Sequence, residues 1–313
     1  MRYINELREG ETVVGHYLCK SKQTLKSRAG KSYYSLKLQD KTGLLDGKVW
    51  DLNNEIKSFE GNDFIKIEGT VLIYNNEPQI NIRRIRKSQE GEYNPMDYIP
   101  STDKDTEEMY KKLMGYISSV NDKYIKALLN QIFMKNDFVL QNLKKHSAAR
   151  TLHHGYLGGL LEHTLSVTEI CDFMSGRYKK VNRDILICTA MLHDIGKIYE
   201  LSQFPVNEYT DDGQLLGHIF IGAEMVHDAA SKIEGFPKNL ESLIKHSILA
   251  HHGEYEYGSP ELPKTIEAFI LHCADNMDAK VKAFEEAVES GSNQGNWIGY
   301  NKMLQRNIRK TDY

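Results

Sequence analysis

The chain has 313 residues and a formal net charge of −3, with 40% hydrophobic and 27% charged residues, which is typical of a soluble globular protein of two or three domains. Residues 1–15 lack the basic and apolar regions of a signal peptide, and the most apolar stretch, residues 185–192, is too short to cross a bilayer. The four cysteines form no CxxC pair. We therefore expect a cytoplasmic protein with reduced thiols and no membrane association, and neither a disulfide framework nor a thiolate zinc site.

Charge and histidine are unevenly distributed along the chain. Residues 1–88 carry a net charge of +5, and the remainder carries −8. Of the 12 histidines, only His16 precedes residue 146. A basic front end suits a polyanionic partner, although ordinary surface variation can give the same charge. The two compositions indicate two domains with different roles.

Residues 1–88 have the pattern of a small β-structure. β-forming residues fill positions 11–20, a basic and turn-rich loop follows to Lys31, and positions 33–39 alternate between apolar and polar residues. We expect further strands at 44–50, 64–74 and 79–82, and a short helix at 53–59. The cations at 83–87 are expected to form a solvated domain edge, with phosphate contact as the alternative. Five strands with a helix between the third and the fourth predict a small closed barrel.

The motif LKLQDKTG at residues 36–43, with VWD at 49–51 and GTV at 69–71, resembles an OB-fold of the tRNA-anticodon-binding type. OB-folds bind single strands on the face of strands two and three and with the 1–2 and 4–5 loops. The resemblance therefore implies a nucleic-acid-binding face.

That face would carry Tyr33 and Lys37, with Lys31 beside them and Tyr74 in the 4–5 loop. An exposed tyrosine next to a lysine can stack on a base while the lysine contacts the backbone. The alternative for Tyr33 is a partly covered strand residue. These four residues are the candidate nucleic-acid contacts.

A change of composition separates the front end from the rest of the chain. Residues 89–104 contain Pro95, Pro100 and polar turn residues, so we expect a linker there. Residues 105–142 show apolar residues at helical spacing and are expected to form a helical connector that serves packing alone. Residues 143–291 form the expected back domain. A C-terminal tail, residues 292–313, packs on a partner subunit or on the barrel.

The back domain carries metal-binding residue types in or beside apolar helical segments. Each of these residues alone is better explained as a satisfied core residue or a helix cap. Imidazole nitrogens and carboxylate oxygens are natural metal ligands, however, and several apolar helices each supply one. Together they predict a metal site. The candidate ligands are His163, His193, Asp194, His218, His251, His252 and Asp275.

The motifs GGLLEHT at 158–164 and HDIGK at 193–197, in an H…HD…H…H…D order, resemble the HD-domain phosphohydrolase superfamily. The resemblance implies an all-α helical bundle, so the expected fold is multidomain, with an N-terminal β-barrel as the only sheet. It also implies two divalent metal ions. Mn²⁺ heads the candidates, with Co²⁺, Fe²⁺ or Zn²⁺ as alternatives. One ion would be held by His163, His193, Asp194 and Asp275, and the other by Asp194, His218 and His251, with His252 as the alternative to His251.

Two ions in one site acidify a water molecule and polarise a phosphoryl oxygen, which promotes hydrolysis of a phosphate ester. Lys197, just past the His-Asp pair, is positioned to contact a phosphate, and a helix-end cation is the alternative. His153 and His154 precede the helix of His163 and could contact substrate or protonate the leaving oxygen. Their alternative role is loop packing.

The order of the two domains and the motif HHGY at 153–156 resemble the YhaM family of 3′-5′ exoribonucleases over nearly the whole chain. The resemblance implies hydrolysis of single-stranded RNA from the 3′ end to 5′-mononucleotides, with single-stranded DNA left open as a substrate. We also expect a homo-oligomer. One rival is a phosphohydrolase of small nucleotides with a regulatory or oligomerising barrel. The other is a non-catalytic nucleic-acid-binding protein.

Overall fold

The computed structural model describes residues 2–53, 56–74, 77–149, 155–290, 295–301 and 304–311. The chain divides into two compact units, Met1–Ser101 and Thr102–Tyr313. The boundary falls inside the segment that the sequence suggested as a linker, residues 89–104.

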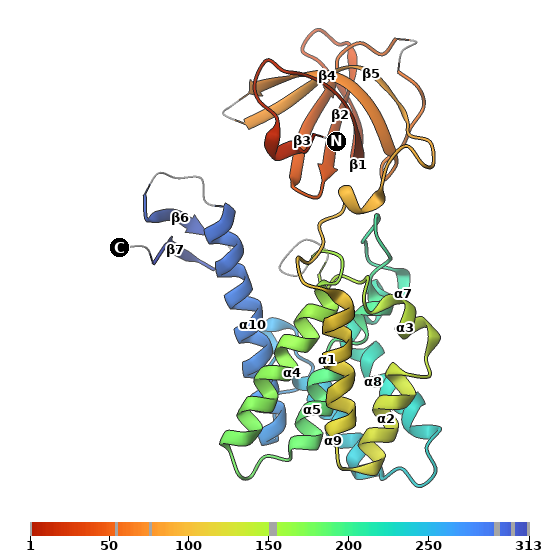
Figure 1. The fold of residues 1–313 in the computed structure, drawn as a ribbon, viewed down its shortest axis with the longest axis vertical. Coiled ribbons are helices and arrows are strands. Elements are labelled where there is room, and N and C mark those ends of the chain that lie inside the picture. The colour runs from red at the N-terminus through yellow and green to blue at the C-terminus, as the bar shows by residue number, and fades with distance from the viewer. Residues whose placement is uncertain are drawn as a thin grey trace. The chain divides into compact units, whose positions relative to one another are not determined.

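The first unit is a closed five-stranded barrel with the strand order β1-β2-β3-β5-β4 (Figure 1). Strands β3 and β5 pair in parallel, and the other neighbours pair antiparallel. Alternate residues point into the barrel, and Leu36, Leu38, Ile65 and Ile67 are fully buried there. The expected barrel is therefore confirmed. Its strands are β1 (Thr12–Lys26), β2 (Ser32–Asp40), β3 (Gly43–Val49), β4 (Phe64–Tyr74) and β5 (Glu77–Lys87).

Three local predictions for the barrel were wrong. Strand β1 continues through the supposed basic loop, because residues up to Lys26 pair with β2. Strand β5 likewise continues through the run of cations at 83–87, since those residues pair with β4. The described residues of 53–59 form no helix. Instead Ile56 bridges to Ile85, and the backbone N–H of Lys57 donates to the carbonyl of Ile85 at 2.9 Å.

The segment that follows β5 belongs to the barrel unit. A short 3₁₀ turn, Pro95–Asp97, precedes Tyr98, which is 2% exposed. The side-chain amide of Gln39 donates to the carbonyl of Tyr98 at 3.0 Å. This segment was predicted to be a linker because of its prolines and polar residues, but it covers the barrel core.

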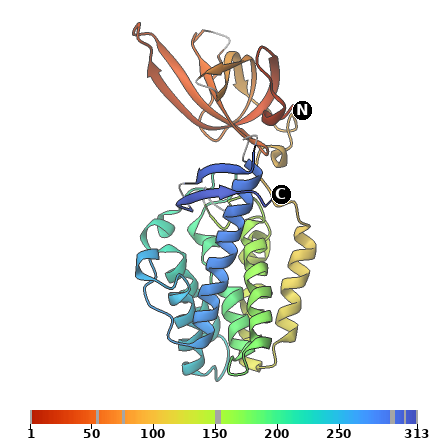
Figure 2. The ribbon, with the colours of Figure 1, turned by 90° about the vertical axis from the view of Figure 1, so that its left-hand side faces the viewer.

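The second unit is a bundle of helices, with α4, α5 and α10 side by side (Figures 1 and 2). Asp105 caps the first helix by accepting hydrogen bonds from the backbone of Glu107 and Glu108. The helices are α1 (Thr106–Ser119), α2 (Lys123–Phe133), α3 (Asp137–Asn142), α4 (Gly159–Arg177), α5 (Arg183–Leu192), α6 (Lys197–Glu200), α7 (Asp211–Leu215), α8 (Gly217–Ser231), α9 (Lys238–Ala250) and α10 (Ile266–Ser290).

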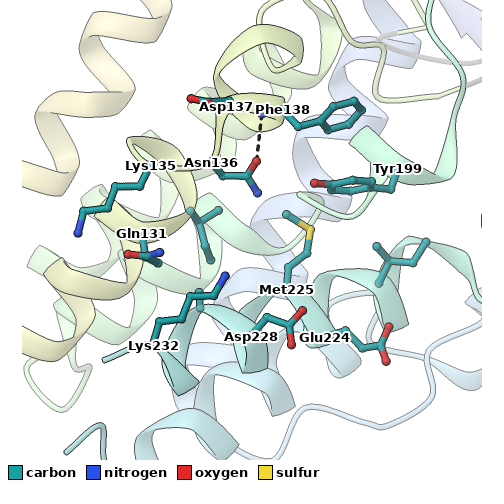
Figure 3. Close-up of a pocket in the computed structure, with 13 residues that line it drawn as sticks. Gln131, Lys135, Asn136, Asp137, Phe138, Tyr199, Glu224, Met225, Asp228 and Lys232 are labelled. Atoms are coloured by element: carbon teal, nitrogen blue, oxygen red, sulfur yellow. Dashed lines mark hydrogen bonds between the residues drawn. The ribbon is translucent and has the colours of Figure 1, made fainter. Parts of the chain in front are cut away.

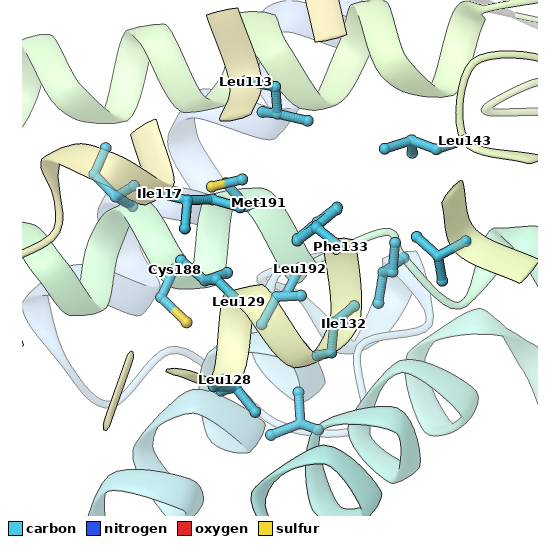
Figure 4. Close-up of a cluster of buried hydrophobic side chains, with 14 of the residues drawn as sticks. Leu113, Ile117, Leu128, Leu129, Ile132, Phe133, Leu143, Cys188, Met191 and Leu192 are labelled. Atoms are coloured by element: carbon cyan, nitrogen blue, oxygen red, sulfur yellow. The ribbon is translucent and has the colours of Figure 1, made fainter. Parts of the chain in front are cut away.

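A large apolar core joins the connector helices to the back domain. Leu113 of α1, Leu129 and Phe133 of α2, and Met191 and Leu192 of α5 belong to one buried cluster (Figure 4). Burial of one such side chain contributes about 1.5–3 kcal/mol. Because α5 leads directly into His193 and Asp194, this core fixes the position of that pair. Among the described residues, no helix has the length and apolar character to span a bilayer.

The C-terminal segment corrects two expectations. It forms a β-hairpin of β6 (Trp297–Asn301) and β7 (Arg306–Arg309), so the helical unit also contains a small sheet. Leu304 and Ile308 of the hairpin segment pack on Ala283 and Ala287 of α10. The described part of the tail therefore covers the end of α10 (Figure 1), whereas the sequence had suggested a partner subunit or the barrel as its contact.

Candidate metal centre

The candidate ligands meet at the ends of helices in the interior of the second unit. His163 lies in the first half of α4, His193 and Asp194 follow α5, and His218 lies in the first turn of α8. His251 and His252 follow α9, and Asp275 lies inside α10. His193, Asp194 and His251 are at most 2% exposed. Segments up to 112 positions apart in the sequence thus supply one buried polar cluster.

A glycine allows this close approach. A Cβ atom on Gly196 would lie 2.1 Å from the carbonyl oxygen of His218 and 2.8 Å from the backbone nitrogen of Gly222. Both of these atoms belong to α8 and cannot rotate away. The HDIGK motif therefore needs its glycine so that the chain entering α6 can pack against the helix that carries His218.

The two carboxylate oxygens of Asp194 face two different groups of histidines. Oδ2 lies 3.4 Å from Nε2 of both His163 and His193. Oδ1 lies 3.5 Å from Nε2 of His218 and 3.6 Å from Nε2 of His251. Oδ1 of Asp275 lies 3.2 Å from Nε2 of His163. Asp194 is therefore shared by two adjacent sets of possible ligands.

In three of the candidate histidines, the ring nitrogen Nδ1 already contacts a backbone carbonyl. Nδ1 of His193 donates to the carbonyl of Ala190 at 2.8 Å, and Nδ1 of His251 donates to that of Ile248 at 2.7 Å. Nδ1 of His252 lies 3.0 Å from the carbonyl of Tyr257. A hydrogen on Nδ1 leaves a lone pair on Nε2, which is the form of imidazole that binds a metal.

Two carboxylates that were not among the candidate site residues hold the remaining histidines. Oδ2 of Asp278 lies 2.7 Å from Nδ1 of His163, and the hydroxyl of Ser166 donates to the same carboxylate. Oε1 of Glu200 lies 2.9 Å from Nδ1 of His218. The side chain of Asp278 is 12% exposed. Its position three residues after Asp275, on the same helix face, was the available signal.

The donor set fits divalent metal ions. Oδ1 of Asp194 and Nε2 of His218 are buried, and neither has a hydrogen-bond partner within the described part of the chain. Burying such atoms unpaired is costly, and a cation removes the cost. His163, His193 and Asp194 offer ligand atoms within 4.8 Å of one another, as do His218, His251 and His252.

The surroundings of the cluster keep the carboxylate of Asp194 ionised and the imidazole of His251 neutral. Burial alone would raise the pKa of Asp194, but the charges of Lys197 and His193 hold it well below its usual range. Burial and the neighbouring His252 and His193 lower the pKa of His251. A carboxylate and a neutral imidazole are the protonation states that ligate metals.

The other residues singled out from the sequence have varied surroundings. The ammonium of Lys197 lies 2.6 Å from Oδ2 of Asp194, inside the cluster. His252 joins the group of His218 and His251, so both of the adjacent histidines lie within reach of one ion. His153 and His154 lie outside the described residues.

The expected contact face of the barrel has an aromatic pair. The ring of Tyr33 stacks on that of Trp50 with a centroid distance of 4.4 Å, and Trp50 is 42% exposed. Lys31 pairs with Asp51, and Nζ of Lys37 lies 2.8 Å from Oδ1 of Asp46.

Trp50 was not among the candidate contacts. The pairing of Tyr34 with Val49 places it beside Tyr33. Tyr74, at the end of β4, is 63% exposed.

A separate cavity of about 570 Å³ is lined by residues of α2, α3, α6 and α8 (Figure 3). Phe138 and Tyr199 stack at one end of it with a centroid distance of 4.8 Å. Lys135 and Lys232 also line it. None of the candidate metal ligands among the described residues contributes to its wall.

Comparison with known proteins agrees with this architecture. Residues 160–280 match the HD domain family, and residues 19–87 match a family described as an OB-fold nucleic acid binding domain. Two solved structures similar to part of the chain are a replication protein A heterotrimer bound to ssDNA and the second OB-fold domain of replication protein A from Methanococcus maripaludis. The first has 13% identity and a TM-score of 0.22 over 28% of this chain and 64% of that chain. The second has 20% identity and a TM-score of 0.23 over 29% and 98%.

A curated relative covers both units. It is the 3′-5′ exoribonuclease YhaM of Geobacillus sp. (strain WCH70), which is 34% identical over 282 residues, or 90% of this chain and 86% of that protein. The match extends across the barrel and the helical unit in the same order. The chain therefore belongs to the YhaM family of 3′-5′ exoribonucleases and is a phosphodiester hydrolase.

Proposed function

We propose that this chain hydrolyses single-stranded RNA from the 3′ end at a dinuclear metal centre and releases 5′-mononucleotides. The observation that carries the proposal is the buried carboxylate of Asp194, whose two oxygens face two separate groups of histidines. A single ion would use only one of these groups. The relative that covers both units is named as an enzyme of this activity.

Two divalent ions would be held by the residues around Asp194. When bound, they supply an acidified water and an electrophilic contact to the phosphoryl group. Mn²⁺ is our first candidate, because imidazole and carboxylate ligands suit it, and Co²⁺, Fe²⁺ and Zn²⁺ share that preference. The first set is His163, His193, Asp194 and Asp275, and the second is Asp194, His218 and His251, with His252 as the alternative to His251.

The chain's own residues orient these ligands and the substrate. Asp278 and Glu200 hold the rings of His163 and His218 through their Nδ1 atoms, so that Nε2 of each points into the cluster. The ammonium of Lys197 is buried beside Asp194 and is available to contact a phosphate oxygen when the ions neutralise that carboxylate. These contacts preorganise the site for a phosphodiester.

The barrel would hold the strand. Tyr33 and Trp50 present a stacked aromatic surface for bases, and Lys31 and Lys37 lie near it for backbone contacts. Tyr74 adds an exposed ring at the 4–5 loop. Stacking does not depend on the sugar, so single-stranded DNA is a second candidate substrate.

We also place the protein in the cytoplasm as a homo-oligomer. Cys19, Cys171, Cys188 and Cys273 are free thiols, as is usual in a reducing compartment. Phe269, Met277 and Val281 of α10 are each about half exposed, and they follow one another at helical spacing on a single face. Light scattering on a sizing column measures the mass, and a monomeric mass would refute the assembly.

Product analysis tests the reaction. We would incubate a 20-nucleotide RNA, labelled on its 3′-terminal nucleotide, with the protein and Mn²⁺, and separate the products by chromatography. The proposal predicts that labelled 5′-mononucleotide appears first, before any shorter oligomer carries the label. The same RNA with a 3′-phosphate, the matching DNA and a panel of small nucleotides serve as comparisons. Turnover of a small nucleotide with intact RNA would favour the rival phosphohydrolase.

A further inference from the structure

The outer surface of strands β1, β4 and β5 carries cations that the expected contact face does not include. Lys66 of β4 pairs across the sheet with Arg86 of β5, and Glu68 pairs with Arg84. The adjacent Ile65, Ile67 and Ile85 point into the core and are at most 1% exposed. Alternation therefore directs the charged side chains outward onto one continuous sheet face.

A further cation is brought to this face by the segment between β3 and β4. The backbone N–H of Lys57 donates to the carbonyl of Ile85 at 2.9 Å, which fixes Lys57 beside β5. Lys57, Lys66, Arg84 and Arg86 together line a groove of about 380 Å³. Val14 also lines the groove and is 63% exposed, so it offers apolar contact among the cations.

The charges of the groove are not balanced. Arg84 pairs with Glu68 at 3.2 Å, and Arg86 pairs with Glu92 at 2.6 Å. Lys57 and Lys66 have no carboxylate partner among the described residues. On the expected contact face, by contrast, Lys31 and Lys37 are both paired with aspartates. The groove therefore has two cations without a described carboxylate partner, whereas Lys31 and Lys37 of the contact face both have one.

We propose that this groove is a second path for single-stranded nucleic acid, which binds the phosphate backbone of the strand on the side of the barrel formed by β1, β4 and β5. The occupant is a polyanion because Lys57 and Lys66 have no carboxylate partner within the described part of the barrel, and Val14 accommodates the apolar edge of a sugar or base. The groove has no aromatic lining residue among those described, so it tracks the backbone and stacks no bases. The barrel is closed, so its outer surface continues from β2 across β1 to this groove. The inference rests on the proposed function, because it assumes that the barrel holds the substrate strand.

The test compares short and long RNA on the full chain. We would measure the fluorescence anisotropy of labelled oligouridylates of 6 and 24 nucleotides. Every protein in the assay carries the Asp194→Asn substitution, so that the RNA is not cleaved. The groove variant is Lys57→Gln with Lys66→Gln, and the control is Lys179→Gln with Lys180→Gln, which removes the same charge from the turn after α4. All four lysines are solvent-accessible side chains, and circular dichroism checks that each variant is folded.

The proposal predicts that the groove variant binds the 24-mer roughly tenfold more weakly and that its affinity falls less steeply with salt, by about 1.4 in the logarithmic slope for two lost phosphate contacts. Its affinity for the 6-mer and both affinities of the control stay unchanged. Unchanged binding of the 24-mer by the groove variant would overturn the proposal and favour an acidic protein as the ligand of the groove. If the parent protein binds neither oligomer, the proposed function itself fails.

Discussion

Acidification should destabilise the helical unit in part through one buried histidine that lies outside the metal cluster. His146 precedes α4 and is 2% exposed, and neither of its ring nitrogens makes a hydrogen bond with the described residues. Its carbonyl accepts a hydrogen bond from the backbone of Leu160, so the residue is fixed at the start of the helix that carries His163. A protonated ring at this position would be a buried and unpaired charge.

The size of the effect follows from the two pKa values of His146. Burial lowers the pKa in the folded chain from 6.5 to about 4. The unfolded chain therefore binds the proton more readily, and stability is lost as the pH falls from 6.5 toward 4. With these values, His146 contributes a loss of about 2 kcal/mol of unfolding free energy at pH 5 relative to pH 8.

The assay is urea denaturation followed by circular dichroism at 222 nm, which reports the helical unit. The wild type is compared with His146→Leu, an apolar side chain of similar volume, at pH 8 and pH 5. Replacing His146 should remove about 2 kcal/mol of the acid-induced loss of unfolding free energy. The control variant is His227→Gln, at an exposed position on α8, and it should show the same acid-induced loss of unfolding free energy as the wild type. An equal loss in wild type and His146→Leu would refute the reasoning.

Three substitutions test other parts of the structure. Asp278→Asn should lower metal affinity and activity roughly 10- to 100-fold, because it weakens the contact that orients His163, and calorimetric metal titration checks it; unaltered metal affinity would count against that role. Trp50→Ala should weaken RNA binding about 5- to 150-fold by removing a stacking surface, as measured by anisotropy, and no change would argue against the Tyr33 face. Gly196→Ala should lower stability by roughly 1–3 kcal/mol and reduce bound metal, because its Cβ would strike α8; a stable, metal-loaded variant would disprove the packing argument.

The fold was predictable where apolar periodicity is strong. The alternation at 33–39 gave β2, and the apolar faces gave the helices that carry His163, His218 and His251. The predicted strand ends were too early where cations follow the apolar residues. Lys26 and the cations at 83–87 lie in strands, because a barrel strand can keep charged residues on its outer face while its backbone is fully paired.

The candidate ligands were identifiable from their motifs, but their supports were not. Asp278 and Glu200 act by contacting the far side of a histidine ring, and that contact depends on how α10 and α6 pack. Trp50 becomes part of the aromatic face only through the register of β2 and β3. Lys57 reaches its groove through a bridge to β5. Apart from the spacing of Asp278 three residues after Asp275, no local pattern indicates these contacts, because they arise from tertiary packing.

The central claim is that the cluster around Asp194 shortens RNA from its 3′ end. The most direct measurement is a sequencing gel of 5′-labelled single-stranded RNA incubated with Mn²⁺ and wild type, Asp194→Asn or Asp228→Asn, the last an exposed aspartate on α8. Our account predicts a ladder that shortens from the 3′ end with wild type and Asp228→Asn, and intact RNA with Asp194→Asn. A ladder with Asp194→Asn, or intact RNA with wild type in every divalent ion, would contradict it.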